Sequence, residues 1–256
     1  MNNLIKLNIF TCCNNIYKDF IPLFILSNIT YNEDCFVEVG VDDDNYDGIK
    51  ESLDVLKTIF GNKFLVYNVN FNNKIYNGKE YMIKSNTVRF LTTPKIKSEF
   101  VYISDVDIIT LEKNIMLTHV NHMEKFNLPY SNVVRGDLEK LTGLHFTPYE
   151  NYYPIPNFND LYEKNLLIQD EKFLYQIVKK RYPNFNMENQ FRPVHGIHIS
   201  PNRPPFASEK NPFNWGIGKW YNEWVNFRNS EHFLMLEPTL TDYIKEKIKI
   251  IDNYSK

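Results

Sequence analysis

The sequence predicts an α/β fold: an open, mainly parallel, Rossmann-like sheet flanked by helices. Short apolar runs alternate with amphipathic helical stretches over residues 4–109, which is the pattern of strands joined by helical crossovers. Two aspartates, Asp105 and Asp107, close the fourth apolar run, where such sheets bind ligands. The 256 residues suffice for one large core, and no linker or repeat divides them. We therefore expect one domain over 1–256.

The first half of the chain supplies the predicted sheet. Apolar runs rich in β-branched and aromatic residues predict strands at 4–10, 35–41, 63–69 and 100–109. The intervening amphipathic stretches predict helices at 16–29, 46–61 and 85–93. Pro22 is tolerated only near the start of the first helix, and Gly61 is a typical end for the second. The asparagine-rich stretch 68–78 is expected to be a loop.

The second half of the chain predicts fewer strands and more connecting segments. In order we expect a helix at 111–126, a strand at 141–147, a loop at 148–160, a helix at 170–183, a strand at 191–200, a proline-rich loop at 201–206 and a helix at 239–252. The last helix carries Leu240, Ile244 and Ile248 on one face. That face predicts packing on the domain, with peripheral contact to a membrane as the alternative.

Charge and cysteine usage exclude several classes of protein. The net charge is −2 with acids and bases interspersed, so there is no electrostatic footprint for nucleic acid. Cys12, Cys13 and Cys35 lack CxxC spacing, which indicates a reducing compartment. No run resembles a signal peptide or a spanning helix. We expect a cytoplasmic protein, with attachment to the inner face of a membrane left open through the last helix.

The acid pair in "FVYISDVDII" (100–109) predicts a metal site. Residues i and i+2 of a strand share one face about 6.6 Å apart, so both carboxylates can turn to one cation where the strand ends. Hard oxygen ligands suit Mg²⁺ or Mn²⁺, which keep open positions for water and phosphate oxygens. A nucleoside diphosphate is therefore the expected further ligand of the metal. A pair of solvated loop acids is the plain alternative.

Two histidines in "PVHGIHIS" (193–200) are candidates for a further metal ligand. His195 and His198 lie three residues apart, on opposite faces of a strand, so only one can face the site. Gly196 between them leaves room for a close approach. One surface and one satisfied core histidine is the alternative. A second pair, His119 and His122, has no acidic or cysteine partner in register and gives little support for zinc.

Asp170 and Glu171 open the helix predicted at 170–183. Acids at a helix N-terminus are stabilised by the helix dipole, so simple capping explains them without any function. The functional interpretation is catalytic: one carboxylate faces an acceptor hydroxyl or a donor sugar, because glycosyl chemistry places a carboxylate near a developing oxocarbenium ion.

Taken in order, these segments resemble the GT-A glycosyltransferases, and among them the retaining family 8 group typified by glycogenin and the bacterial lipopolysaccharide galactosyl- and glucosyltransferases. The likeness spans about residues 5–205. It is carried by "NIFTCCNNIYKDFIPLFILSNI", "NTVRFLTTPKIKSEFVYISDVDII", "GLHFTPYENYY", "LLIQDEKFLYQIV" and "HGIHISPNRPP". The resemblance implies a nucleotide-sugar-binding half at 1–115, an acceptor-side half at 116–210 and a C-terminal helical extension at 211–256.

The resemblance also implies roles for individual residues. Asp105 and Asp107 would hold the metal, with His198 as the third ligand and His195 as its substitute. The implied donor-binding residues, beside the two acids, are Thr11, Tyr17, Arg89, Tyr102 and Arg203. Arg203 would neutralise the leaving diphosphate, because a guanidinium can pair with two phosphate oxygens. For these arginines and aromatic residues the alternatives are a surface ion pair, a solvated loop residue and a core aromatic.

The predicted function is transfer of a hexose from a nucleoside diphosphate sugar, UDP-linked by resemblance, to a glycan or glycolipid acceptor in cell-surface polysaccharide or lipooligosaccharide assembly. Two alternatives remain at this point. A phosphohydrolase of the haloacid dehalogenase type also carries paired acids after an apolar strand, although Ile109 replaces its usual Thr or Val. A non-catalytic nucleotide-sugar or carbohydrate-binding module would use the Tyr- and Trp-rich stretches to stack on sugar rings.

Overall fold

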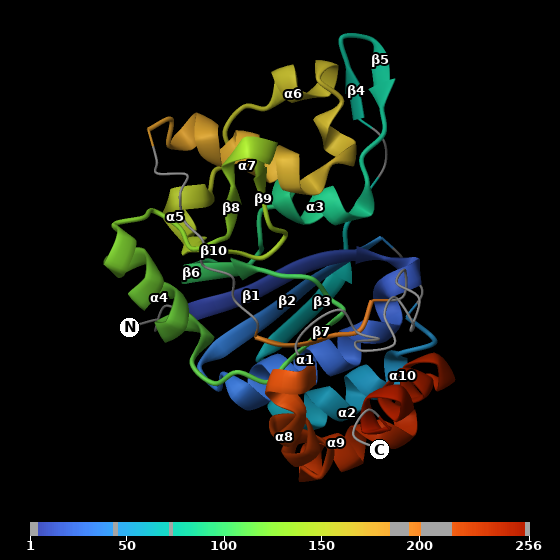
Figure 1. Ribbon diagram of the computed structural model, residues 1–256. Coiled ribbons are helices and arrows are strands. Elements are labelled where there is room, and N and C mark those ends of the chain that lie inside the picture. Colours follow the sequence, from blue (N-terminus) through green and yellow to red (C-terminus); the bar gives the residue numbers. More distant parts are fainter. Residues whose placement is uncertain (1–4, 43–45, 72–73, 185–194, 201–216, 254–256) are drawn as a thin grey trace.

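The computed structural model describes residues 5–42, 46–71, 74–184, 195–200 and 217–253. Its centre is a five-stranded sheet with the order β10-β6-β1-β2-β3, which lies in Figure 1 between two layers of helices. The strands are β1 (Ile5–Asn14), β2 (Cys35–Asp42), β3 (Phe64–Asn68), β6 (Ser98–Ile103) and β10 (His145–Pro148). The first four are parallel and β10 is antiparallel to β6. The predicted α/β fold with a mainly parallel sheet is confirmed.

Side chains that alternate along β1 serve two cores, one on each face of the sheet. Leu7 and Ile9 join the core on one face, and Phe10 and Cys12 join the core on the other. Because successive residues of a strand point to opposite faces, a strand buried on both faces is apolar at most positions. This explains why five of the seven residues at 4–10 are apolar, the exceptions being Lys6 and Asn8.

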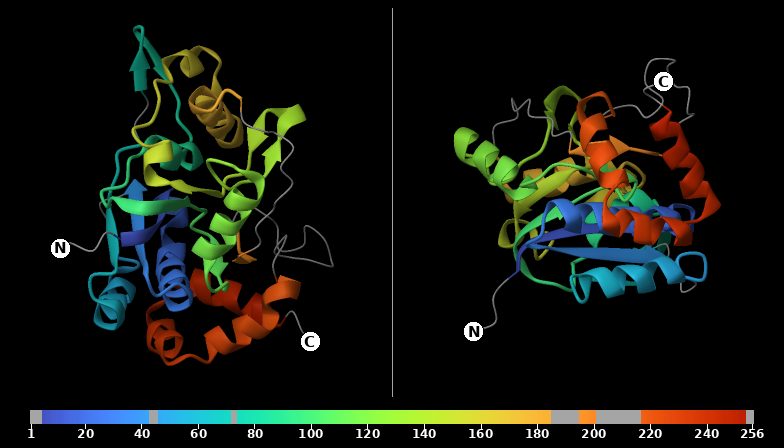
Figure 2. Two further views of the ribbon diagram at one scale, coloured as in Figure 1. Left: turned by 90° about the vertical axis from the view of Figure 1, so that its left-hand side faces the viewer. Right: turned by 90° about the horizontal axis from the view of Figure 1, so that it is seen from below.

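Helices cover both faces of the sheet, as Figures 1 and 2 show from three directions. One layer contains α1 (Ile21–Tyr31), α2 (Lys50–Phe60) and the C-terminal helices α8 (Ile217–Arg228), α9 (Glu231–Leu236) and α10 (Asp242–Asp252). The opposite layer contains α3 (Ser85–Leu91), α6 (Asn159–Glu163) and α7 (Asp170–Arg181). The remaining helices are α4 (Ile115–Phe126), α5 (Tyr149–Tyr152) and the 3₁₀ turns η1 (Asn15–Phe20), η2 (Gly136–Leu138), η3 (Leu166–Ile168) and η4 (Glu237–Thr239).

A fully buried carboxylate ties the connection before β6 to the sheet. Glu38 of β2 accepts hydrogen bonds from the side chains of Asn8 at 2.9 Å and Tyr67 at 2.8 Å. It also accepts the backbone N–H groups of Lys95 at 2.6 Å and Ile96 at 3.1 Å. A buried charge is tolerated when its oxygens are fully hydrogen-bonded. Glu38 therefore fixes the chain that leads into β6 and the acid pair.

Local signals explain most helix boundaries. Pro22 is the second residue of α1, and the residues before it form the 3₁₀ turn η1 instead of the helix predicted from residue 16. Proline is favoured in a first turn because the N–H it lacks would have no partner there. Gly61 ends α2 with a φ of 61°, as predicted. The stretch predicted as a loop at 68–78 is partly a hairpin, β4 (Lys74–Tyr76) with β5 (Lys79–Tyr81).

The predicted strand at 100–109 is two strands. β6 ends at Ile103, the acid pair lies in the connection, and β7 (Ile108–Thr110) pairs instead with β11 (Gly196–His198) in a separate antiparallel sheet. The predicted strand at 141–147 is likewise divided, into β9 (Lys140–Leu141), which pairs with β8 (Val134–Arg135), and β10. Of the strand predicted at 191–200, residues 196–198 form β11, and 185–194 lie outside the described residues.

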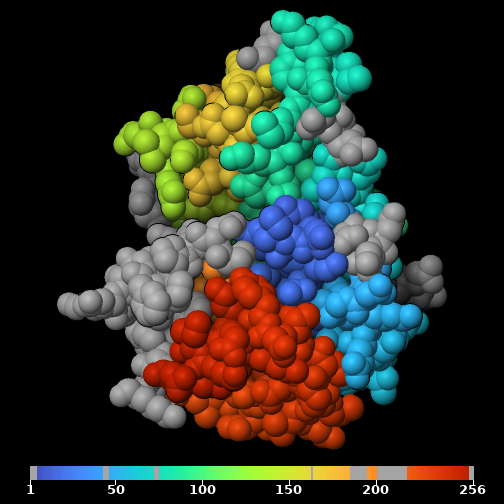
Figure 3. Space-filling model, turned by 90° about the vertical axis from the view of Figure 1, so that its right-hand side faces the viewer, coloured from blue at the N-terminus to red at the C-terminus, as the bar shows by residue number. Residues whose placement is uncertain are grey.

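The C-terminal helices pack on the domain. Leu240, Ile244 and Ile248 are at most 4 % exposed and belong to the core shared with α1 and α2. In Figure 3 these helices form the lower part of the molecular surface. Because the apolar face of α10 is covered by the protein, it is not available for the membrane contact that the sequence left open. In the described ranges, no helix is long and apolar enough to cross a bilayer.

Candidate active site

The candidate site lies where the strand order of the sheet reverses. The chain passes from β1 to β2 and β3, and then returns to place β6 on the other side of β1. In open α/β sheets, ligands bind beyond the carboxyl ends of the strands at such a switch point. Residues 12–17 span the carboxyl end of β1 and the start of η1, and the acid pair follows the end of β6. The topology therefore brings both segments to one edge.

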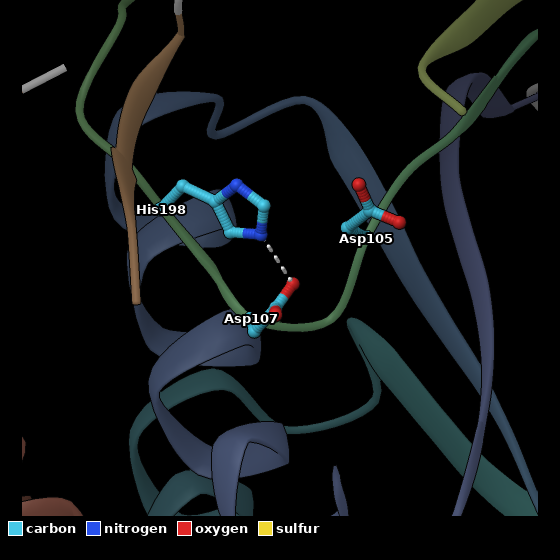
Figure 4. A group of neighbouring side chains, drawn as sticks. All are labelled: Asp105, Asp107 and His198. Atoms are coloured by element: carbon cyan, nitrogen blue, oxygen red, sulfur yellow. Dashed lines mark ion pairs between the residues drawn. The ribbon is translucent and has the colours of Figure 1, made fainter. Parts of the chain in front are cut away.

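Three side chains converge at this edge (Figure 4). Asp105 and Asp107 come from the connection between β6 and β7, and His198 comes from β11. His198 Nε2 lies 3.2 Å from Asp107 Oδ1, and both side chains are less than 10 % exposed. One ligand atom from each of the three residues lies within 4.8 Å of the other two. Among the described residues, this is the one group of at least three His, Cys, Asp or Glu side chains that lie close enough together to hold a metal ion.

The donor set fits a divalent cation. Two carboxylates and one imidazole are ligands that Mn²⁺ accepts readily, and Mg²⁺ shares the preference for the carboxylates. Asp107 is only 5 % exposed, and a buried carboxylate beside a second acid requires a compensating charge. Three protein ligands leave positions open for water or phosphate oxygens.

Arg89 of α3 connects the acid pair with α7. Its side chain is 5 % exposed, and its guanidinium pairs with Asp105 and lies 3.5 Å from Asp170 Oδ2. Burial opposes the charge of Arg89, but Asp105 and then Asp170 outweigh burial, so its pKa lies above the usual arginine value. A Cβ atom on Gly143 would lie 2.5 Å from a guanidinium nitrogen. Glycine at 143 therefore makes room for the bridge.

The two acids that open α7 have different partners. Asp170 contacts Arg89, whereas Glu171 lies 3.5 Å from Arg135 and 3.4 Å from Lys140. The N-cap residue of α7 is Gln169, whose side chain makes no capping hydrogen bond, and both carboxylates that follow it lie against cations. Capping in this narrow sense therefore does not account for the pair, although the dipole of α7 still favours their charges.

A cavity of about 540 Å³ lies over these side chains. The charged groups in its described wall are four carboxylates and two cations: Asp105, Asp107, Asp170, Glu171, Lys84 and Arg89. Acids thus outnumber bases around the space. This imbalance favours a bound cation and disfavours a bare phosphate.

The residues predicted to line a nucleotide pocket do not all lie at the cavity. Tyr17 lines the cavity, and burial followed by the charge of Asp107 raises its pKa. Thr11 and Tyr102 are buried at 0 % and 2 % exposure and lie outside the cavity wall. His195 is turned away from the acid pair, toward Glu112 and His119. Arg203 lies outside the described residues.

Several wall residues escaped the sequence analysis. They include Cys13, Asn14, Lys84, Ser85, Asn86, Gly143 and Ser200. Asn14 had a usable signal, because it lies with Asn15 between the strand predicted at 4–10 and the helix predicted from residue 16. Gly143 had none, since its importance depends on a guanidinium 54 residues earlier in the chain.

No protein-family model matches the sequence, and no curated protein sequence matches it significantly. An active-site mutant of LgtC matches in structure with a TM-score of 0.53 at 11 % identity, covering 90 % of this chain and 99 % of that one. The galactosyltransferase LgtC with donor and acceptor sugar analogues gives 0.48 at 12 % identity, with 94 % and 99 % covered. The glycosyltransferase GlyE of Streptococcus pneumoniae gives 0.50 at 12 % identity, with 94 % and 64 % covered. The chain therefore has the GT-A fold that glycosyltransferases adopt.

Proposed function

We propose that the protein is a metal-dependent glycosyltransferase of the family 8 type. It moves a hexose from a nucleoside diphosphate sugar, most simply a UDP-sugar, to a glycan or glycolipid acceptor. The setting we propose is cytoplasmic assembly of a cell-surface polysaccharide or lipooligosaccharide. The observation that carries the proposal is the group of Asp105, Asp107 and His198 at the switch point of a GT-A sheet, beneath a cavity of about 540 Å³.

The charge of the cavity makes donor binding depend on a cation. A diphosphate entering a wall with four carboxylates and two basic groups meets net repulsion in the described part of the site. Bound Mn²⁺ or Mg²⁺, held by the two aspartates and His198, would supply Lewis-acid stabilisation of the charge that develops on the leaving diphosphate. Lys84 and Arg89 are the cations that this chain itself adds.

The side chains of the protein mainly orient the metal, the donor sugar and the acceptor hydroxyl. Arg89 holds Asp105 and Asp170 in a fixed relation, so that one acid belongs to the metal group and the other lies at the start of α7. Asp170 and Glu171 both reach the cavity and are the proposed catalytic residues. In an inverting reaction one of them takes the proton of the acceptor hydroxyl. In a retaining reaction, which family 8 membership implies, the leaving phosphate takes that proton and the acid steadies the sugar.

The division of the chain follows from the same proposal. The elements up to residue 115 form the donor side, residues 116–210 form the acceptor side, and 211–256 form a helical extension. Donor binding would involve Tyr17 at the cavity wall, with Arg203 as a proposed partner of the diphosphate. The phosphohydrolase and the non-catalytic binding module are not favoured, because the chain has the fold of the compared glycosyltransferases.

The test is a thermal-shift screen of nucleoside diphosphates with and without Mn²⁺. A ligand at 100 times its Kd stabilises the folded state by about 2.7 kcal/mol, which raises Tm by roughly 5–10 °C for a domain of this size. We expect that shift for UDP with Mn²⁺, a small one for either alone, and none in Asp107→Ala.

Asp54→Ala on the exposed face of α2 is the matched control, since it removes a carboxylate far from the cavity wall and should keep the full shift. A shift of equal size in Asp107→Ala would contradict the proposal. Hydrolysis of a UDP-sugar in the absence of an acceptor, dependent on Mn²⁺ and lost in the same variant, would distinguish an enzyme from a binder.

A further inference from the structure

A continuous chain of buried polar side chains runs behind the candidate site. Glu112 bonds to His195 Nδ1, and His195 Nε2 lies 2.8 Å from His119 Nε2. His119 Nδ1 lies 2.6 Å from Ser131 Oγ, which lies 2.8 Å from His122 Nδ1. The four members other than Glu112 are at most 5 % exposed. None of the five lines the cavity, so the proposed chemistry does not use them directly.

Hydrogen-bond donors and acceptors match along this series of side chains. Burial raises the pKa of Glu112, but the hydrogen bond and charge of His195 outweigh burial, so the carboxylate is an acceptor. Burial lowers the pKa of His119 well below the usual value, so that ring is neutral. A neutral His119 ring has one donor and one acceptor nitrogen, so it donates on one side of the network and accepts on the other, toward His195 and Ser131. Each link then has one donor and one acceptor, as buried polar groups require.

This series of side chains includes a residue next to the strand that carries the third proposed metal ligand. His195 directly precedes β11, and His198 is the last residue of that strand. β11 has three residues and pairs only with β7 among the described strands. A pair of strands this short has little stability of its own. Its position therefore depends on what fixes its ends.

Both ends of β11 are fixed, in different ways. At one end, the backbone N–H of Ile199 donates to the carbonyl of Asp107 at 2.8 Å. At the other, the carbonyl of His195 accepts the N–H groups of Leu111 at 2.9 Å and Glu112 at 3.1 Å. The imidazole of His195 adds a connection to α4 through His119, which backbone pairing cannot supply. Because α4 packs beside the sheet, this connection ties the strand to the body of the domain.

We propose that Glu112, His195 and His119 are positioning residues that hold β11 against β7 and thereby place His198 beside Asp107. The inference deepens the proposed function and rests on it for the identity of the site. The bonded arrangement also explains why His195 does not serve as a metal ligand: both of its ring nitrogens are occupied, by Glu112 and by His119.

The first test is amide hydrogen exchange on the full chain without ligand. In His195→Ala the backbone carbonyl of residue 195 remains, so the amides of Leu111 and Glu112 lose protection only if the strand moves away. We expect those amides and that of Ile199 to exchange at least about tenfold faster, because buried hydrogen bonds have been lost. Glu112→Ala should act alike and is the milder variant, since this side chain is 18 % exposed.

Two control variants distinguish a positioning role from a general loss of stability. Glu112→Gln keeps one oxygen that can accept from His195, and its NH2 group can donate to Thr118 Oγ1, which lies 2.9 Å from Glu112 Oε1, so it should restore most of the protection. His145→Ala removes another imidazole that is 1 % exposed, bonded to Asn132 and outside the chain. It should lower Tm but leave the three amides protected.

The second test is binding of Mn²⁺ with UDP, measured from the loss of the free Mn²⁺ electron-resonance signal. Changes in the partners of metal ligands typically weaken metal binding roughly 10–100-fold, and we expect that range for His195→Ala and Glu112→Ala. His145→Ala and Glu112→Gln should stay within about threefold of the parent protein, well below that range.

The outcomes distinguish the two proposals. Unchanged exchange in His195→Ala and Glu112→Ala, or equal acceleration in His145→Ala, would overturn the positioning role whether or not a metal binds. Faster exchange with unchanged Mn²⁺ affinity would also overturn it. A parent protein that binds no Mn²⁺ with any nucleoside diphosphate would refute the proposed function. In that case the exchange data would still decide whether Glu112, His195 and His119 hold β11 in place.

Discussion

One buried guanidinium sets the orientation of two carboxylates in the cleft. Arg89 is 4 % exposed and reaches Asp105 on one side and Asp170 on the other. These acids come from different layers of the fold, after β6 and at the start of α7. The geometry depends on the planar guanidinium of arginine, whose N–H groups can bond to two carboxylates at once. The ammonium group of a lysine is a point charge and cannot fix both directions.

Replacing Arg89 should therefore affect both stability and activity. In Arg89→Met two carboxylates lose their partner, and breaking a buried pair costs about 3–5 kcal/mol. We expect about 3 kcal/mol, because Asp105 and Asp170 keep 28 % and 21 % of their side-chain surface. Arg89→Lys should recover part of the stability but little of the transferase activity. Urea unfolding and UDP-sugar turnover measure the two effects.

The control for this prediction is Arg181→Met. Arg181 is bonded to two backbone carbonyls, those of Pro154 and Glu150, at an exposed position. Its replacement should cost less than about 1 kcal/mol, as exposed interactions usually do. If Arg89→Met were as stable as Arg181→Met, the buried bridge would not be an organising feature of the site.

At the scale of elements, the short pair of β7 and β11 determines the distance between the acids and His198. The two strands approach unusually closely at Gly196, where a Cβ atom would lie 1.8 Å from the carbonyl oxygen of Ile109. That separation is shorter than any real contact, and the neighbour is backbone that cannot rotate away. Glycine is thus required by close approach and not by its φ angle.

We expect Gly196→Ala to disrupt this pairing and displace His198. The variant should lose most Mn²⁺-dependent UDP binding in the thermal-shift assay while the central sheet stays folded, since β7 and β11 form a separate sheet. Gly48→Ala is the matched control, because nothing lies within 4 Å of the Cβ added there. Full UDP binding by Gly196→Ala would show that the close approach does not position the histidine.

The same pair shows where sequence patterns stop being informative about elements. The sequence predicts one strand over residues 100–109, yet the chain leaves the sheet at Ile103 because Ile108–Thr110 pairs with a segment almost 90 residues later. Nothing local encodes that partner. By contrast, the Asn77-Gly78 turn of the β4–β5 hairpin carries a local signal that the loop prediction for 68–78 missed: both residues have positive φ, the conformation that an Asn-Gly hairpin turn requires.

At the scale of the whole molecule, the sequence was sufficient for the order of the four parallel strands of the central sheet and for the edge at which the acid pair lies. Alternating strands and helices, with acids at the end of a buried run, follow from local patterns. The bridge from Arg89 to Asp170 and the contact between His195 and His119 span 81 and 76 residues. Such contacts are made by the topology, so a single sequence could suggest the residues but not their partners.

Burial of neutral histidines has a consequence for the stability of the whole fold. Burial lowers the pKa of His145 to about 3 and that of His119 well below the usual value. In the unfolded chain both would titrate near 6.5. Between these limits the unfolded state binds more protons than the folded state, so the free energy of unfolding falls as pH falls. The contribution is complete above pH about 6.5 and is lost progressively toward pH 3.

We predict that His145→Phe flattens this dependence. Each such histidine contributes a slope of about 1.4 kcal/mol per pH unit, so the variant should lose that much slope between pH 6 and 4. Phenylalanine fits among the rings of Tyr130 and Tyr152, whose centroids lie 5.3 and 5.5 Å from His145, and Asn132 keeps its bond to Thr142. Urea unfolding at a series of pH values, with reductant for the free cysteines, measures the slope.

His232→Phe, at an exposed imidazole, is the control and should keep the parent slope. An unchanged slope in His145→Phe would mean that this ring is protonated in the folded protein, against its burial. A loss of slope in both variants would point to a change in the unfolded state. A loss in His145→Phe alone, at constant dependence of stability on urea concentration, would establish that a buried neutral imidazole makes the fold acid-sensitive, since only the native state keeps that ring from its proton.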